Sequence, residues 1–461
     1  MKPKLSDLFD AFQGVVPSII ATAGADGTPN VTYNSQVYFV DENHVALSCQ
    51  FFNKTHRNVR ENPAATVEVY EPVTLQAWRL RLHFDHMETE GPLFDAMALR
   101  IQVIASHTGM SGVFKLRSAD VYEVLSLEPV EGMFLPIDPG APVALPLGPL
   151  TELKGLQLVS DRINRATDLE GLLAGALESL DETFGFSHAM VLVPEEADAG
   201  HLVALATRGY GTAGVGAEVK LGEGIIGLCA ERRKIIRLGG MGGELRYGRA
   251  LRARAANEGG KLAPEVPLPG LDRPQAQLAI PLQVGGRLLG VLALESEDPL
   301  RFDDWDEPYL TVVANQIALG MDRMMGQEED AGHAPAPARR AGHGRATPPP
   351  AAKTRRFRYY RNDDCVFVDG EYLVRNVPAK ILWKVLGEHA RDGRLEFTNR
   401  ELRLDPSLGL PALKDNLESR LILLRKRLEE KCPDVKLVPV RRGRFALQLC
   451  AAVELEEAAT G

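Results

Sequence analysis

The sequence predicts a multidomain α+β protein, and three observations support this fold class. The chain has 461 residues, which is too long for a single hydrophobic core. Its first third shows the two-residue alternation of half-buried strands, whereas helical spacing of leucines begins near residue 150. A Pro/Ala-rich stretch then precedes a basic terminal segment. We therefore predict domains over residues 1–145, 150–326 and 355–452, with a flexible linker over residues 327–354.

The charge of the chain is unevenly distributed. The net charge is −9, yet residues 355–450 contain 21 Lys+Arg and 14 Asp+Glu, a balance of +7 that leaves −16 for the remainder. A basic terminal segment on an acidic body predicts that this end binds a polyanion.

Cysteine and hydropathy patterns indicate the compartment. The five cysteines are scattered, and no two have the spacing of a metal or redox motif, so we expect reduced thiols in a cytoplasmic protein. No apolar run is long enough to span a membrane, and the first residues lead into no signal-peptide core, so we expect no membrane partner. His83 and His86 point to opposite faces of a predicted strand, and we predict no metal site.

The most informative local pattern is a corner over residues 51–63. A strand delivers Phe51 and Phe52, a short basic helix follows, and Asn62-Pro63 ends it because proline cannot continue a helix. Residues 64–70 then alternate as a strand. Backbone N–H groups and cations at such a corner favour a bound phosphate. The alternative is an amphipathic helix between two strands with an ordinary solvated basic face.

The same corner carries a family resemblance. The pattern Asn53-Lys54-Thr55-x-x-Asn58-Val59-x-x-Asn62-Pro63-x-Ala65-x-Val67, preceded by a predicted hairpin over residues 17–35, resembles the pyridoxamine-phosphate-oxidase-like, FMN-binding split barrel. The resemblance covers about residues 1–130 and implies a split β-barrel with FMN beside the lysine-and-asparagine turn; family members also bind haem or a deazaflavin, or no ligand. The cofactor-binding residues that it implies are Asn34, Ser48, Gln50, Asn53, Lys54, Thr55 and Asn58.

The central segment opens with two predicted helices and continues with strands. Leu221-Gly222-Glu223-Gly224-Ile225-Ile226-Gly227, Ala279-Ile280-Pro281-Leu282 and Leu289-Gly290-Val291-Leu292-Ala293-Leu294-Glu295 resemble a GAF domain over about residues 150–326. The resemblance implies an α/β sandwich on an antiparallel sheet, which senses small ligands and dimerises, so we expect a homodimer.

The candidate ligand-binding residues of this central domain are Arg246, Tyr247 and Cys229. Arg246 and Tyr247 lie in a Gly-rich stretch, residues 239–274, which we predict as a loop; a lid over an anionic ligand is one interpretation of it. The alternatives are a mobile surface loop and, for Cys229, a small buried core thiol.

The basic terminal segment predicts a hairpin, three helices and a second hairpin. The first helix starts at Pro378, the second begins with a capping signature at Thr398, and the third covers residues 410–431 with leucines at 4-3-4 spacing. This order resembles the response-regulator type of winged helix-turn-helix over about residues 357–450. The resemblance implies DNA as partner, bound by Arg420, Arg425, Lys426, Arg427, Lys431, Arg441, Arg442 and Arg444.

Two features depart from the winged-helix pattern. Arg444-Phe445 stands where Gly-x-Gly-Tyr is usual in the wing, and residues 403–411 are rich in proline and glycine for a helix-turn corner. Phosphate contacts, which provide affinity, are therefore easier to defend than base contacts, which provide specificity. The alternative is a basic domain that binds protein or RNA.

Together these resemblances predict a cytoplasmic, ligand- or redox-responsive transcriptional regulator that binds an FMN-like cofactor and a small molecule and acts through DNA. The alternatives are a split-barrel flavin-dependent oxidoreductase with a regulatory GAF domain and an adaptor with empty pockets. We find no His/Asp/Ser arrangement that identifies a catalytic acid, base or nucleophile, so an enzyme is the less expected outcome.

Overall fold

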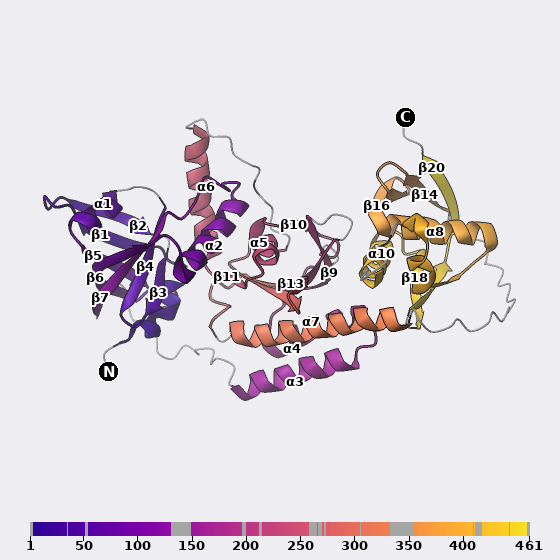
Figure 1. Ribbon diagram of the computed structural model, residues 1–461, viewed down its shortest axis with the longest axis horizontal. Helices are drawn as coiled ribbons and strands as arrows, with labels where there is room; N and C mark the ends of the chain where they lie inside the picture. The colour runs from indigo at the N-terminus through magenta and orange to yellow at the C-terminus, as the bar shows by residue number, and fades with distance from the viewer. Residues whose placement is uncertain are drawn as a thin grey trace.

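The computed structural model describes the chain in segments. These are residues 3–34, 36–50, 54–130, 149–195, 200–211, 214–257, 265, 270–271, 273–304, 306–331, 354–408, 410, 417–441 and 443–458. The N-terminal domain lies at one end of the molecule, the central domain follows, and the C-terminal module lies at the other end (Figure 1). Most of the predicted linker lies outside the described residues, since the last central helix ends at Ala331 and the next strand starts at Thr354.

The N-terminal domain is a seven-stranded antiparallel sheet of order β2-β1-β5-β6-β7-β4-β3, which confirms the predicted split-barrel-like sheet. Alternating residues of β5 are buried, as its sequence pattern predicts. The elements are η1 Leu5–Phe12, β1 Ser18–Ala23, β2 Pro29–Asn34, β3 Val37–Asp41, β4 His44–Cys49, α1 Lys54–Glu61, β5 Ala64–Tyr70, β6 Ala77–Glu88, α2 Pro92–His107 and β7 Ser118–Pro129.

The central domain has a six-stranded antiparallel sheet of order β10-β9-β8-β13-β12-β11. Helices α3, α4 and α7 share a core with one face of the sheet, whereas α5 and α6 cover the other face (Figure 1). The elements are α3 Pro149–Arg165, α4 Leu169–Phe184, β8 His188–Pro194, β9 His201–Arg208, β10 Glu218–Lys220, α5 Gly224–Arg232, β11 Ile236–Leu238, α6 Met241–Asn257, β12 Ala276–Val284, β13 Arg287–Ser296 and α7 Asp306–Ala331.

Helix α6 corrects one prediction, because the stretch that we expected to be a loop over residues 239–274 begins with this 17-residue helix. The run of alanine and arginine at Arg249–Ala256 consists of strong helix formers, and it outweighs the glycines that precede it.

The C-terminal module combines a four-stranded sheet, β16-β15-β14-β20, with three helices and a three-stranded sheet, β17-β19-β18. Strand β20 pairs in parallel with β14 and extends the module beyond the predicted boundary at residue 452. The elements are β14 Thr354–Tyr360, β15 Cys365–Val368, β16 Glu371–Arg375, α8 Asn376–Asp392, β17 Glu396–Thr398, α9 Asn399–Arg403, η2 Pro406–Leu408, α10 Leu417–Lys431, β18 Val435–Arg441, β19 Arg444–Leu449 and β20 Ala452–Ala458.

The central domain contacts both of its neighbours. Helix α2 of the N-terminal domain packs on α5 and α6, and its buried side chains belong to the same hydrophobic core as theirs. Helix α10 of the C-terminal module lies against α4 and β9. None of the described helices is long and apolar enough to cross a membrane.

Candidate functional site

The corner singled out in the sequence forms as a strand, a helix and a second strand. Helix α1 begins at Lys54, ends before Asn62-Pro63 and leads into β5, as predicted. The helix is anchored on β1, because Val59 is buried and the buried Asn58 amide donates from Nδ2 to Thr22 Oγ1 at 3.2 Å. The second turn of α1 is therefore held against the sheet.

A small cavity of about 70 Å³ opens beside this corner. Four of the predicted cofactor residues line it: Asn34 at the end of β2, Ser48 and Gln50 at the end of β4, and Thr55 in α1. The structure thus brings together residues that are up to 21 positions apart in the sequence. This cavity is the candidate functional site.

The remaining predicted cofactor residues lie elsewhere. Asn53 is outside the described residues. Lys54 is exposed and points to the β2 side, where Nζ lies 3.4 Å from Pro29 O. Asn58 serves the packing of α1 on β1 rather than the cavity.

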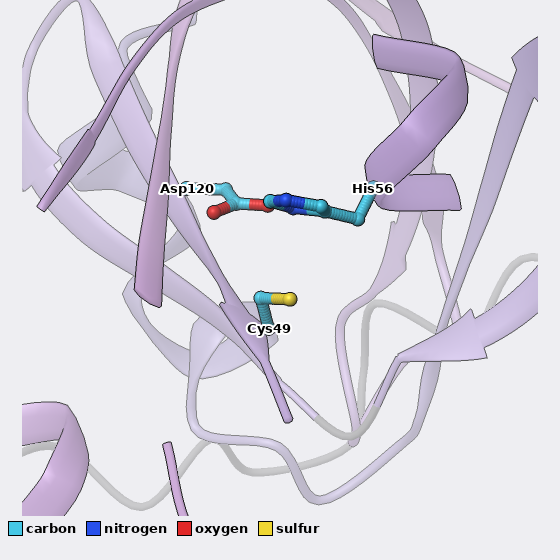
Figure 2. A group of neighbouring side chains, drawn as sticks. All are labelled: Cys49, His56 and Asp120. Atoms are coloured by element: carbon cyan, nitrogen blue, oxygen red, sulfur yellow. The ribbon is translucent and has the colours of Figure 1, made fainter. Parts of the chain in front are cut away.

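Three side chains with metal-binding or nucleophilic chemistry meet in the cavity. Cys49 ends β4, His56 is in the first turn of α1, and Asp120 lies in β7 beside β4. Their donor atoms lie within 4.8 Å of one another, with His56 Nδ1 at 3.2 Å from Asp120 Oδ2 (Figure 2). Burial, aided by the charge of Asp120, raises the pKa of the Cys49 thiol.

Sequence reasoning missed this group of three residues. It compared cysteines only with one another and tested only His83 and His86 as histidine ligands. The available signal was the spacing of Cys49 and His56 at the two ends of the strand-to-helix corner. Asp120 is 64 residues from His56 and reaches it only because β7 pairs with β4.

Tyr122 and Tyr247 also belong to the lining of the cavity. Tyr122 of β7 is buried, and this burial raises the pKa of its phenol well above the ordinary value. Tyr247 comes from α6 of the central domain, and its ring packs edge-on against Phe114 of the N-terminal domain at 6.1 Å between centroids. The cavity is therefore closed in part by the neighbouring domain.

The predicted ligand residues of the central domain do not gather at one place. Tyr247 faces the N-terminal cavity, and Arg246 Nε donates to Gly242 O of its own helix at 3.1 Å. Cys229 is completely buried in the core shared by the two domains, and burial raises the pKa of its thiol, which fits the alternative of a core cysteine.

The described lining does not fit a flavin. Pockets for ligands of drug size are roughly 300–1,000 Å³, and this cavity is several times smaller. None of its described lining residues is a lysine or arginine, and Asp120 contributes a carboxylate that repels phosphate. The cavity is better suited to water and a small ligand.

The predicted DNA-binding residues are largely engaged in ion pairs. Arg425, whose side chain is 10% exposed, donates to Glu170 of α4 and to Glu418, both at 3.2 Å. Lys426 Nζ lies 3.4 Å from the same Glu170.

The other predicted DNA-binding residues are spread along α10 and the last hairpin. Arg427 pairs with Glu430, Lys431 with Glu371, and Arg444 with Glu396, whereas Arg420 lines a groove beside Val193 of the central domain. Arg442 and the side chain of Arg441 are outside the described residues.

Two family models of known proteins match parts of the chain. Residues 7–131 match the family model of pyridoxamine 5'-phosphate oxidase, and residues 168–321 match that of the GAF domain. The chain therefore carries a domain like pyridoxamine 5'-phosphate oxidase followed by a GAF domain. No curated protein matches the chain.

Solved structures resemble parts of the chain. The GAF domain of a phosphoenolpyruvate-protein phosphotransferase from Coxiella burnetii is 24% identical and has a TM-score of 0.31, covering 39% of this chain and 98% of its own. HupZ from Group A Streptococcus is 17% identical with a TM-score of 0.23, over 27% of this chain and 92% of its own. An FMN-binding protein from Syntrophomonas wolfei is 16% identical with a TM-score of 0.23, over 28% and 90%.

Proposed function

Because a domain like pyridoxamine 5'-phosphate oxidase precedes a GAF domain in this chain, we propose that the protein is a cytoplasmic sensory regulator whose C-terminal module is a winged helix that binds DNA. One observation supports DNA binding by the C-terminal module, namely the order of its helices and strands. Helices α8, α9 and α10 are followed by the hairpin β18–β19, and β17 joins this hairpin to form a three-stranded sheet. A third helix followed by a hairpin is the arrangement that winged helices present to DNA.

The sequence of the module explains this arrangement. Thr398 and Glu401 form a capping box that starts α9. The leucines of α10 that are spaced 4-3-4 are all buried in the core of the module, which leaves the basic residues on the remaining faces. These leucines are Leu417, Leu421, Leu424 and Leu428. The helix is therefore held by its apolar stripe and offers its cations outward.

In the conformation described, those cations face the GAF domain. Glu170 of α4 accepts from both Arg425 and Lys426, and Ile422 of α10 belongs to the core around α3, α4 and α7. DNA and Glu170 compete for the same cations. We therefore propose that DNA binding requires α10 to leave the GAF domain, and that a sensed ligand shifts this equilibrium.

The test is selection of duplexes from a random DNA pool by the full-length chain, followed by affinity measurements at several salt concentrations. We expect salt-dependent binding, because phosphate contacts release counterions. Glu170→Gln should tighten binding several-fold, since each ion pair that it removes contributes about 0.2–1 kcal/mol to the docked state.

The matched control is Glu178→Gln, on the same helix, whose partner Arg162 lies within the GAF domain. This variant should leave DNA affinity unchanged. Absence of salt-dependent binding to any duplex, for the wild type and for Glu170→Gln alike, would contradict the proposed output.

The flavin prediction needs its own test, because the described cavity disfavours it. Purified chain is incubated with FMN, and the fraction that retains flavin absorption after gel filtration is measured. Retention that is lost in Thr55→Ala and Gln50→Ala would restore the prediction. A protein that stays colourless removes FMN from the proposal and leaves the DNA output untouched.

A further inference from the structure

The cavity at the corner of α1 holds a set of side chains that the proposed function does not use. We propose that Cys49, His56 and Asp120 bind a divalent transition metal of the zinc class. The three residues provide one sulfur, one nitrogen and one oxygen donor, which is the donor set that Zn²⁺ takes in proteins. The thiol and imidazole disfavour Mg²⁺ and Ca²⁺, which prefer oxygen ligands. This inference does not depend on DNA binding or on flavin binding.

The geometry is close to that of a metal site. The donor atoms lie within 4.8 Å of one another. Around a tetrahedral Zn²⁺ with bonds of about 2.0–2.3 Å, donor atoms are roughly 3.3–3.8 Å apart. His56 Nδ1 and Asp120 Oδ2, at 3.2 Å, are already at that separation. Small side-chain rotations of Cys49 therefore suffice to close the site.

The directions of the three donor groups suit metal coordination. Figure 2 shows the imidazole edge-on and pointing at the Asp120 carboxylate, with the Cys49 sulfur displaced from the plane of the ring. Three donors that surround one point from different directions suit coordination.

Burial and charge also fit a dication. The side chains of His56 and Asp120 are 12% and 6% exposed, and Cys49 is buried. On binding, the thiol releases its proton to solvent and the imidazole coordinates as a neutral ligand. One thiolate and one carboxylate then balance the charge of a divalent cation.

A neighbouring hydroxyl orients the carboxylate. Ser118 Oγ donates to Asp120 Oδ1 at 2.6 Å, which leaves Oδ2 directed at His56. Such hydrogen bonds to ligating carboxylates are typical of metal sites and fix the ligand before the metal binds.

The fourth coordination position opens into the cavity. A volume of about 70 Å³ exceeds the space for one water, which needs about 10–15 Å³. Three protein ligands and an open position are typical of zinc sites that exchange water for a small ligand. The metal would therefore give the N-terminal domain a place to bind a small anionic or thiol ligand.

The test uses the reduced full-length chain after treatment with a chelator, titrated with Co²⁺ and then with Zn²⁺. We expect one Co²⁺ per chain with visible d–d absorption and a thiolate-to-cobalt charge-transfer band, and we expect Zn²⁺ to displace it. Absence of the charge-transfer band in the wild type would overturn the proposal, and this measurement needs no variant to fold.

Single-residue variants identify which side chains bind the metal. Cys49→Ser should abolish the charge-transfer band, and His56→Ala and Asp120→Asn should each raise the Kd for Zn²⁺ by more than Ser118→Ala does, which we expect to raise it about 10–100-fold. The control is Cys450→Ser, because Cys450 is exposed and in the C-terminal module. Circular dichroism checks that each variant is folded.

The outcomes are distinct. A charge-transfer band that persists in Cys49→Ser, or that is lost in Cys450→Ser, would show adventitious binding and overturn the site. A chain that binds DNA but no Co²⁺ overturns the metal inference alone, whereas a chain that binds Co²⁺ through Cys49 but no DNA overturns the proposed output alone.

Discussion

The GAF domain has two interfaces, and they are built from different interactions. Toward the N-terminal domain, α2 contributes Met97, Ile101 and Ile104 to a core that continues into α5 and α6. Toward the C-terminal module, Arg425 and Lys426 pair with Glu170, Arg375 pairs with Glu218 at 2.5 Å, and Ile422 is the buried apolar contribution of α10 to the GAF core.

The first interface also contains buried hydrogen bonds, and cavities border the second interface. At the first interface, the buried Gly224 N–H donates to Ser106 Oγ at 2.8 Å and Arg100 donates to Gly239 O at 3.0 Å. At the second interface, cavities of about 340 and 260 Å³ remain beside α10.

This difference indicates that the two interfaces differ in stability. Continuous apolar burial resembles the interior of one domain, whereas ion pairs beside cavities resemble a contact between separable domains. We infer that the first two domains act as one sensing unit and that the C-terminal module is exchangeable between bound and released states. The following predictions test that contrast, beginning with the largest expected effect.

The strongest disruption should come from a cavity in the first interface. Ile104→Ala removes a fully buried side chain of α2 that lies close to Gly248 of α6. We expect a loss of about 2–5 kcal/mol in the free energy of unfolding, measured by chemical denaturation of the full chain. Leu125→Ala, at an exposed position of β7, should change it by less than about 0.5 kcal/mol. Equal effects of both variants would contradict the inferred continuous core.

A pair of glycine substitutions in α6 tests the same packing of α2 against α6. A methyl group on Gly248 would lie 2.8 Å from Thr108 Cγ2, whereas one on Gly243 meets nothing within 4 Å. Gly248→Ala should therefore destabilise by about 1–3 kcal/mol through overpacking, and Gly243→Ala should stabilise by roughly 0.5–1 kcal/mol through helix propensity. Thermal denaturation of both variants measures the sign of the change in stability. Changes of the same sign would show that α2 does not constrain α6.

The smallest effect concerns salt at the second interface. Raising NaCl from about 0.05 M to about 0.5 M shortens the screening length and weakens ion pairs of about 0.2–1 kcal/mol each. Hydrogen exchange should accelerate in α10 and in the first turn of α4, while α2 and α6 stay protected. Uniform exchange at both interfaces would show that they are equally stable.

Local patterns predicted the parts of the fold that depend on neighbouring residues. The corner of α1, the alternation in β5 and the two family regions all depend on short sequence signals, and the structure and comparisons confirm them. Glycines misled the prediction for residues 239–274, because the alanines and arginines that follow form α6.

The candidate site was less predictable, for a physical reason. Asp120 reaches His56 only through the pairing of Leu47 with Asp120 across β4 and β7, and strand order is not encoded in the period of a single strand. Tyr247 belongs to a different domain from the rest of the lining, so its place depends on how two domains pack. The ion pairs of α10 with Glu170 likewise join residues 255 positions apart.

Strand β20 decides how tension along the chain would enter the C-terminal module. It lies parallel to β14 along the whole of that strand, from Thr354 opposite Ala452 to Tyr360 opposite Ala458. A pull from the sensing unit would act on the start of β14. This strand is hydrogen-bonded along both edges, to β15 and to β20. Separating β14 from the module would break two ladders of hydrogen bonds rather than one, so we expect a pull to displace the module intact.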